Sequence, residues 1–179
     1  MGKTFGIHWA ATTHGTWLHG DVRGSWRNGQ LIGPDPFLEA AARARMSRGA
    51  VLLDSCERAI VARAFGVAVR EWGYEVLVAT IQPTHFHLIF APHSDSMETI
   101  VARLKYRSSA AVLKHRSECG FETPRSLWTG GMFPVFMFSE SHLSNAIEYV
   151  HRHNRRDELP NDPYDWIRAA IPNGDRSAI

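Results

Sequence analysis

Hydrophobic and polar positions along the chain change several times between the two-residue period of strands and the spacing of helices. Strand-like patterns cover residues 5–12, 74–81, 84–91 and 132–138. Pro83 separates the second from the third, which predicts a hairpin or a bent continuation, because proline cannot donate a hydrogen bond in the middle of a ladder. A run rich in Gly, Trp, Asp and Arg over residues 13–28 predicts a long loop.

Helical spacing of apolar residues fills the intervals between these strands. It predicts a short helix over residues 36–47 and three longer helices, one before 74, one from 97 and one near the C-terminus. Each long helix is preceded by a residue that can cap it. The capping signals are Asp54 with Glu57 three residues later, Ser96, and Ser139 or Ser141, while Gly73 marks the end of the first long helix.

The resulting order is strand, helix, strand pair, helix, strand, helix. This order predicts an α+β, ferredoxin-like sandwich, with an antiparallel sheet, helices packed on one face and a C-terminal helix that carries Tyr149. Residues 1–155 are expected to form one domain. The segment 156–179 contains Pro160, Pro163 and Pro172, and we expect it to be a tail that is loosely ordered or drapes over the surface.

Composition adds few constraints. A length of 179 residues favours one domain, since roughly 100–200 residues per domain is usual. The formal charge of +2 does not by itself indicate a polyanionic partner. Cys56 and Cys119 form no disulfide framework and no zinc-binding spacing. No leader and no apolar run of membrane-spanning length is evident, so the expected location is the cytoplasm, without a membrane partner.

Two pairs of residues carry the candidate chemistry. His85 and His87 lie on one face of a predicted strand, because successive side chains alternate. Tyr149 and His153 lie one helical turn apart and also share a face. Taken alone, a His-x-His pair is more often a pair of surface or hydrogen-bonded histidines, and a lone tyrosine is more often a packing residue. If the helix crosses the strand, the two pairs form a metal site beside a phenol.

Four segments, in order along the chain, resemble the HUH single-stranded DNA endonucleases, specifically the one-tyrosine transposases of the IS200/IS605 type and their relatives associated with repetitive extragenic palindromes (REP). The segments are residues 12–24 (TTHGTWLHGDVRG), 83–90 (PTHFHLIF), 127–133 (LWTGGMF) and 146–154 (AIEYVHRHN). A His-x-His pair alone would be a weak signal, whereas four ordered segments are a specific one.

The resemblance implies a metal-dependent DNA nuclease and strand transferase acting on single-stranded or hairpin DNA, in a homodimer. Tyr149 would attack the scissile phosphate and form a 5′-phosphotyrosine. His85 and His87 would bind a divalent ion, Mg²⁺ or Mn²⁺, with His153 as the third ligand. The family usually has Asn or Gln at that third position, whereas this chain has His153 followed by Asn154.

Candidate DNA contacts lie on a basic helix and among the tryptophans. The helix carries Arg103, Lys105, Arg107 and Lys114. In one interpretation these side chains form a solvated face, and in the other they contact DNA phosphates. Trp17 and Trp128 either belong to the core or stack on unpaired bases.

Two other functions remain open at this stage. A domesticated relative could bind hairpin or single-stranded DNA without cutting it, given the departure at His153. A metal-dependent hydrolase of another phosphate ester is the third possibility.

Overall fold

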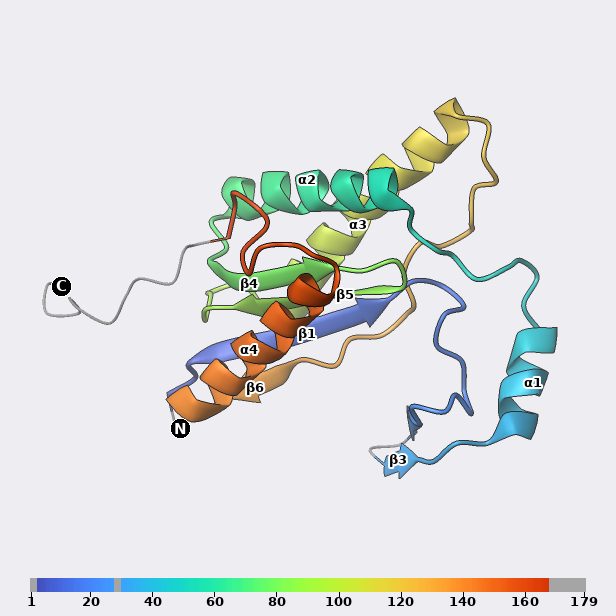
Figure 1. Ribbon diagram of the computed structural model, residues 1–179, viewed down its shortest axis with the longest axis horizontal. Helices are drawn as coiled ribbons and strands as arrows, with labels where there is room; N and C mark the ends of the chain where they lie inside the picture. The colour runs from blue at the N-terminus through green and yellow to red at the C-terminus, as the bar shows by residue number, and fades with distance from the viewer. Residues whose placement is uncertain (1–2, 28–29, 168–179) are drawn as a thin grey trace, which may run out of the picture.

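A four-stranded antiparallel sheet forms the centre of the protein. The computed structural model describes residues 3–27 and 30–167. The sheet contains β1 (Gly6–Thr12), β4 (Val76–Ile81), β5 (His85–Phe90) and β6 (Val135–Met137) in the order β4-β5-β1-β6 (Figure 1). The strands that flank Pro83 form the predicted hairpin, β4–β5. This antiparallel sheet with its helices confirms the predicted α+β class.

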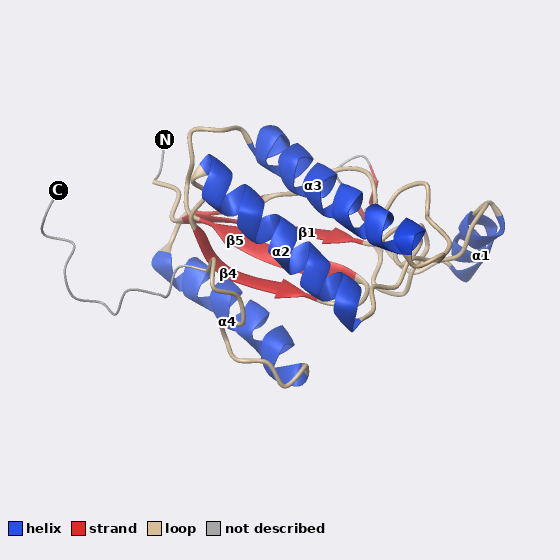
Figure 2. Cartoon of the chain, turned by 90° about the horizontal axis from the view of Figure 1, so that it is seen from above, coloured by secondary structure: helices blue, strands red, loops and turns tan. Residues whose placement is uncertain are grey.

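Helices cover both faces of the sheet. The helices α2 (Ser55–Trp72) and α3 (Met97–Glu118) pack on one face, and α4 (Glu140–Arg156) packs on the other (Figures 1 and 2). Successive side chains of a strand point to opposite faces of the sheet, so each strand contributes residues to both layers. Trp9, Phe86 and Leu88 belong to the larger core under α2 and α3, whereas Val78 and Ile89 meet Val150 of α4. The sequence pattern did not specify the face on which the tyrosine helix lies.

Local signals fix the ends of the long helices. Asp54 and Glu57 form a reciprocal capping box at the start of α2, and Gly73 ends that helix in the left-handed conformation, with a φ of 69°. Ser96 caps α3 and Ser139 caps α4, each by accepting a hydrogen bond from a backbone N–H three residues on. The capping predictions are therefore confirmed, and Ser139 is the cap at the last helix.

Residues 13–27 and 30–50 form an arm that extends from the end of β1 (Figure 1). The arm contains a hairpin of β2 (Ser25–Arg27) and β3 (Gln30–Ile32), followed by α1 (Pro36–Ala44). The first part was predicted to be a loop, and the three-residue strand β2 is too short to give a periodic signal. The base of the arm is fixed to the β4–β5 turn, where the Thr84 carbonyl accepts hydrogen bonds from the Thr13 amide (2.8 Å) and from Oγ1 of Thr16 (3.2 Å).

The segment after α4 returns to the core side of the sheet. Trp166 is 8% exposed and belongs to the larger core. Its ring passes so close to α2 that a Cβ at Gly66 would lie 2.5 Å from Cδ1 of Trp166. As far as Ile167 the expected tail is therefore anchored in the domain, while Pro172 lies outside the described residues. Within the described part of the chain, no helix combines the length and the apolar character that crossing a membrane requires.

Candidate metal centre and active site

The β5 strand directs His85 and His87 to the face of the sheet that α4 covers. Phe86 and Leu88 point the other way into the core, as the alternation predicts. His87 pairs in register with Ala10 of β1, whose small side chain leaves room for the imidazole. The two histidine rings lie 5.0 Å apart between centroids. The strand therefore provides two neighbouring imidazoles on a rigid support.

The α4 helix places Tyr149 and His153 over these histidines. Val150 and Asn154 are completely buried and hold the helix on the sheet, which leaves the preceding positions, one turn apart, beside the strand. The Tyr149 ring centroid lies 4.8 Å from that of His153 and 5.3 Å from that of His87. The predicted convergence of the strand pair and the helix pair is present in the structure.

Three imidazoles offer a donor set for a metal ion. One ligand atom from each of His85, His87 and His153 lies within 4.8 Å of the other two. Nδ1 of His87 contacts Nε2 of His8 at 2.9 Å, and Nδ1 of His85 contacts the Thr84 hydroxyl at 3.0 Å. The Nε2 atom of each strand histidine is thus the one available for an ion.

This donor set fits a divalent transition ion. Two nitrogens that each bind an ion at about 2.1 Å are about 4 Å apart or less. The ligand atoms of the three histidines lie within 4.8 Å of one another, so small side-chain rotations would bring them to the separation that a bound ion requires. Mn²⁺ accepts imidazole more readily than Mg²⁺, which prefers oxygen ligands and retains water. His153 can ligate, while the neighbouring Asn154 is fully buried and donates through Nδ2 to the carbonyls of Ala79 and Asn161.

Burial keeps these imidazoles neutral. Desolvation, followed by the charge of His153, lowers the pKa of His85 to about 4. Burial and then the neighbouring His8 lower the pKa of His87 well below its usual value. The pKa of His153 is also lowered, first by burial and then by Arg156. Neutral imidazoles at neutral pH have free lone pairs for an ion.

His8 is a site residue that the sequence analysis missed. It lies on β1, two residues before Ala10, on the same face as His87. Besides its 2.9 Å contact with His87, its ring centroid lies 6.5 Å from that of Tyr149. A single histidine in an apolar strand gives no signal by itself. The position of His8 near His87 follows from the strand register, and that register requires knowledge of the pairing of β1 with β5.

A cleft of about 830 Å³ opens over the histidines. Its walls come from β1, β5 and α4, from the segment 129–133, and from the arm. Tyr149 is 41% exposed and Trp17 is 39% exposed. Trp17 and Arg23 line it on the side of the arm, and Thr129 and Gly131 line it on the side of the segment 129–133. The phenol is accessible from solvent, and the cleft is large enough for part of a nucleic-acid strand.

Of the predicted DNA contacts, Trp17 reaches this cleft and Trp128 does not. Trp128 is 3% exposed, packs edge-on against Phe86, and donates its indole N–H to Ser108. Of its two alternatives, the core position is the one observed, and Trp128 is not available as a DNA contact because its ring and its N–H group are already used inside the protein. The side chain of Trp26, a further tryptophan of the arm, lies outside the described part of the structure.

The basic residues of α3 have partners within the protein. Arg103 pairs with Asp95 at 2.5 Å and Lys114 pairs with Glu118 at 3.7 Å, while Arg107 pairs with Glu71. Lys105 donates to the carbonyls of Thr129 (2.8 Å) and Gly131 (2.9 Å) and so supports the cleft wall. Carboxylates of the protein itself therefore balance the charge of three of these four side chains. DNA contact by the four side chains stays a prediction.

The fold and the site together define a mixed α/β domain with a tyrosine beside a histidine cluster. The family model described as "Transposase IS200 like" matches residues 45–153, more than half of the chain. The protein therefore belongs to the IS200-like transposase family.

One solved structure supports this fold. A REP-associated tyrosine transposase bound to a REP hairpin aligns with a TM-score of 0.52 and 11% identity, over 88% of this chain and 71% of that one. A protein of Deinococcus radiodurans R1, described as a candidate transposase, aligns with a TM-score of 0.48 and 12% identity, over 88% of this chain and 93% of that one. No curated protein matches the sequence.

Proposed function

We propose that the protein is a metal-dependent endonuclease and strand transferase for single-stranded DNA that acts near a hairpin through a 5′-phosphotyrosine. The observation that carries this proposal is the position of the Tyr149 ring, 4.8 Å from His153 and 5.3 Å from His87 between centroids. Membership of a transposase family favours DNA as the substrate. The structural relative was solved with a REP hairpin bound, which supports a hairpin as the first substrate to test.

In the proposed reaction, the phenolic oxygen of Tyr149 attacks the phosphorus of one phosphodiester. The new Tyr–O–P bond replaces the P–O3′ bond, the phenol proton passes to water, and the departing 3′-oxygen takes up a proton to become a hydroxyl. A covalent phosphotyrosine retains a phosphodiester bond. Attack on it by another 3′-hydroxyl would therefore transfer a strand without an external energy source.

His85, His87 and His153 would hold a divalent ion, Mn²⁺ or Mg²⁺. When bound, such an ion supplies positive charge next to the phosphate and stabilises the charge that attack develops on its oxygens. The three ligands carry no negative charge of their own. Tyr149 is partly exposed, so its hydroxyl can reach a strand that enters the cleft.

The test is a covalent-adduct assay with a DNA hairpin carrying single-stranded flanks, in Mn²⁺ and in Mg²⁺. A label at the 3′ end should become attached to the protein and survive denaturation in detergent, whereas a label at the 5′ end should appear in a shorter free fragment. Tyr149→Phe should abolish both products, because it removes only the attacking oxygen.

Tyr106→Phe is the matched control, because Tyr106 is 75% exposed on α3 and does not line the cleft. It should form the adduct at the wild-type rate. Chelation of the ion, or His87→Ala, should also prevent adduct formation. Cleavage that persists in Tyr149→Phe would exclude a tyrosine mechanism and favour a hydrolase.

A DNA-binding protein without cleavage activity remains the second candidate, supported by His153 at a position where the resemblance leads us to expect Asn or Gln. This second candidate predicts that the protein binds the hairpin but forms no covalent adduct with it in Mn²⁺ or in Mg²⁺. His153→Asn separates the two candidates further. If the histidine has replaced a working ligand, this change should create or increase adduct formation; if His153 is the ligand in use, the change should leave activity equal or lower.

A further inference from the structure

We propose that Arg23 of the arm binds the phosphodiester that Tyr149 attacks, so that the phosphate lies between this guanidinium and the histidine cluster. The inference rests on the proposed function and adds a phosphate-binding residue to it. Arg23 lines the same cleft as His85 and Tyr149. It lies in the arm, before the residues that the family model matches.

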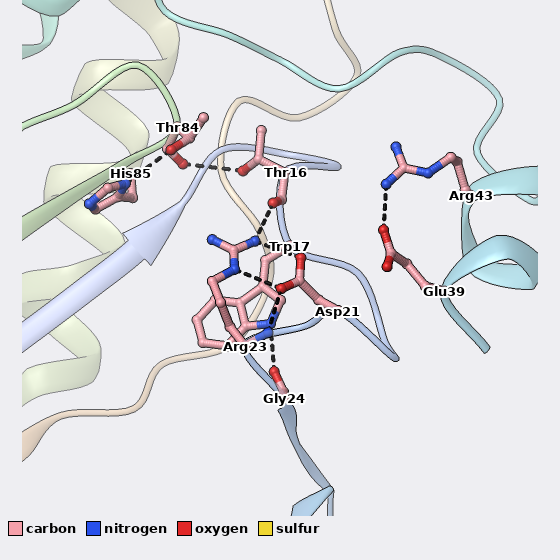
Figure 3. A network of polar contacts seen from close by, with 9 residues as sticks. All are labelled: Thr16, Trp17, Asp21, Arg23, Gly24, Glu39, Arg43, Thr84 and His85. Carbon is pink, nitrogen blue, oxygen red and sulfur yellow. Dashed lines mark hydrogen bonds and ion pairs between the residues drawn. The ribbon is translucent and has the colours of Figure 1, made fainter. Parts of the chain in front are cut away.

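The guanidinium of Arg23 is held in a fixed position (Figure 3). Nε and Nη2 donate to the two carboxylate oxygens of Asp21, each at 2.7 Å, and Nη2 also donates to the Thr16 carbonyl at 2.7 Å. The group stacks over the Trp17 ring at 5.0 Å. Trp17 is fixed in turn by donation from Nε1 to the Gly24 carbonyl at 2.8 Å. Nη1 has no hydrogen-bond partner among the described residues and is free for a ligand.

A short chain of contacts connects this group to the metal site (Figure 3). The Thr16 backbone oxygen binds Arg23, while the Thr16 hydroxyl donates to the Thr84 carbonyl at 3.2 Å. The Thr84 hydroxyl contacts Nδ1 of His85 at 3.0 Å. The arm is thus anchored next to the histidines, which sets the position of Arg23 relative to them.

The balance of charge indicates what belongs between the two groups. Three neutral imidazoles give a divalent ion no negative charge, and a nearby guanidinium opposes binding of that ion. Asp21 balances the formal charge of Arg23, but its carboxylate lies against Nε and Nη2, so the side of the guanidinium that carries Nη1 stays locally positive. An anion between guanidinium and ion would turn the repulsion into two attractions. The two hydrogens of Nη1 remain to donate to phosphate oxygens, because Nε and Nη2 already donate to Asp21 and Thr16.

The alternative is that Arg23 only stabilises the arm. The two roles predict different signs of effect. A phosphate-binding Arg23 opposes the ion in the free protein and favours DNA. Replacing it should therefore strengthen ion binding without DNA and weaken DNA binding. Loss of a structural support would weaken both or change neither.

The experiment measures two affinities in the Tyr149→Phe background, where DNA is bound and not cut. Mn²⁺ alone is titrated first, followed by the hairpin oligonucleotide with single-stranded flanks in the presence of Mn²⁺. For Arg23→Gln we expect Mn²⁺ to bind about 2- to 5-fold more tightly and the oligonucleotide about 10-fold more weakly. The slope of log affinity against log salt should fall by about 0.7, as for one lost contact with a single strand.

Two further variants complete the design. Arg43→Gln removes a cation of the same arm that pairs with Glu39 on α1 and does not line the cleft, so neither affinity should change (Figure 3). Arg23→Lys keeps the charge and loses the planar fork, so Mn²⁺ affinity should stay at the wild-type level. Unchanged or weaker Mn²⁺ binding in Arg23→Gln, or unchanged oligonucleotide binding, would overturn the proposal. Absence of any adduct in the wild type would instead contradict the proposed cleavage, and these affinities would still test Arg23.

Discussion

Four histidines of three different elements meet beside the Tyr149 ring, and they fall into two groups. His85 and His87 come from β5 and His153 comes from α4, and these three present ligand atoms. His8 of β1 contacts only His87 among them by a hydrogen bond. A neutral imidazole that ligates through Nε2 carries its proton on Nδ1. His87 would then donate to His8, which fixes the orientation of the His87 ring.

We predict that His8 affects ion affinity without being a ligand. Replacing His8 by Phe removes the acceptor for His87, and the loss of such a partner costs about 10-fold in metal affinity. His8→Gln retains an acceptor and should recover most of the affinity. Mn²⁺ titration of the purified variants measures this directly. An affinity in His8→Phe equal to that of the wild type would show that the contact does not orient the ligand.

The helix α4 carries Tyr149 and His153, and Asn154 fixes that helix to the sheet. Asn154 is completely buried, and Nδ2 donates to the Ala79 carbonyl of β4 at 2.9 Å and to the Asn161 carbonyl at 2.8 Å. One amide group thus connects the helix, the sheet and the C-terminal segment. The neighbouring His153 depends on this anchoring for its position over β5.

We predict that Asn154→Ala lowers the free energy of unfolding by about 2 to 3 kcal/mol, because two buried hydrogen bonds are lost and two carbonyls lose a donor. Urea unfolding followed by tryptophan fluorescence measures this value. Arg155→Ala, next in sequence and 46% exposed at the side chain, is the control and should cost less than about 1 kcal/mol. Equal effects of the two changes would contradict the anchoring role.

The C-terminal segment gives a prediction on pH. Tyr164 stacks on Trp166 with ring centroids 5.1 Å apart, and burial raises its pKa to about 12. Since the folded-state pKa lies above the unfolded value of about 10, the stabilisation is fully present below pH 10. It should be lost as the pH rises from about 10 to about 12.

Tyr164→Phe removes this titration. The difference in free energy of unfolding between the wild type and Tyr164→Phe should therefore shift in favour of the variant over the same pH range. Denaturant unfolding at pH 9, 10 and 11 measures the shift. A difference that is constant with pH would mean that the hydroxyl titrates equally in both states.

For the molecule as a whole, we propose a homodimer, and the outer edge of β6 is the surface that supports this expectation. The strand lies at one edge of the sheet. Val135 and Phe136 on this strand are 48% and 44% exposed, and Phe138 beyond it is 62% exposed. An exposed apolar edge strand favours association with another chain.

Val135→Lys should shift the protein toward the monomer, since a lysine on an edge strand opposes pairing. Light scattering coupled to size exclusion measures the mass of each variant over a range of concentrations. Val67→Lys, at a position on α2 that is 43% exposed, provides the matched control and should leave the mass unchanged. A monomeric wild type at all concentrations would contradict the dimer.

Much of the fold followed from the sequence because its signals are local. Alternation in β5 located the paired histidines, and the caps at Asp54, Ser96 and Ser139 placed the helix starts. Isolated residues in short or irregular segments gave weaker signals. Trp128 was indistinguishable from a surface tryptophan, because the Ser108 hydroxyl that receives its N–H lies 20 residues earlier in the chain.

Two pairs of candidate site residues, His85 with His87 and Tyr149 with His153, could be identified from the sequence, since each pair depends only on the repeat of one strand or one helix. That α4 covers the same face as the histidines became known only from the folded chain. The folded chain also added His8 and Arg23 to the site. The physical reason is that strand register and the anchoring of the arm arise from contacts between distant segments, which no local periodicity encodes.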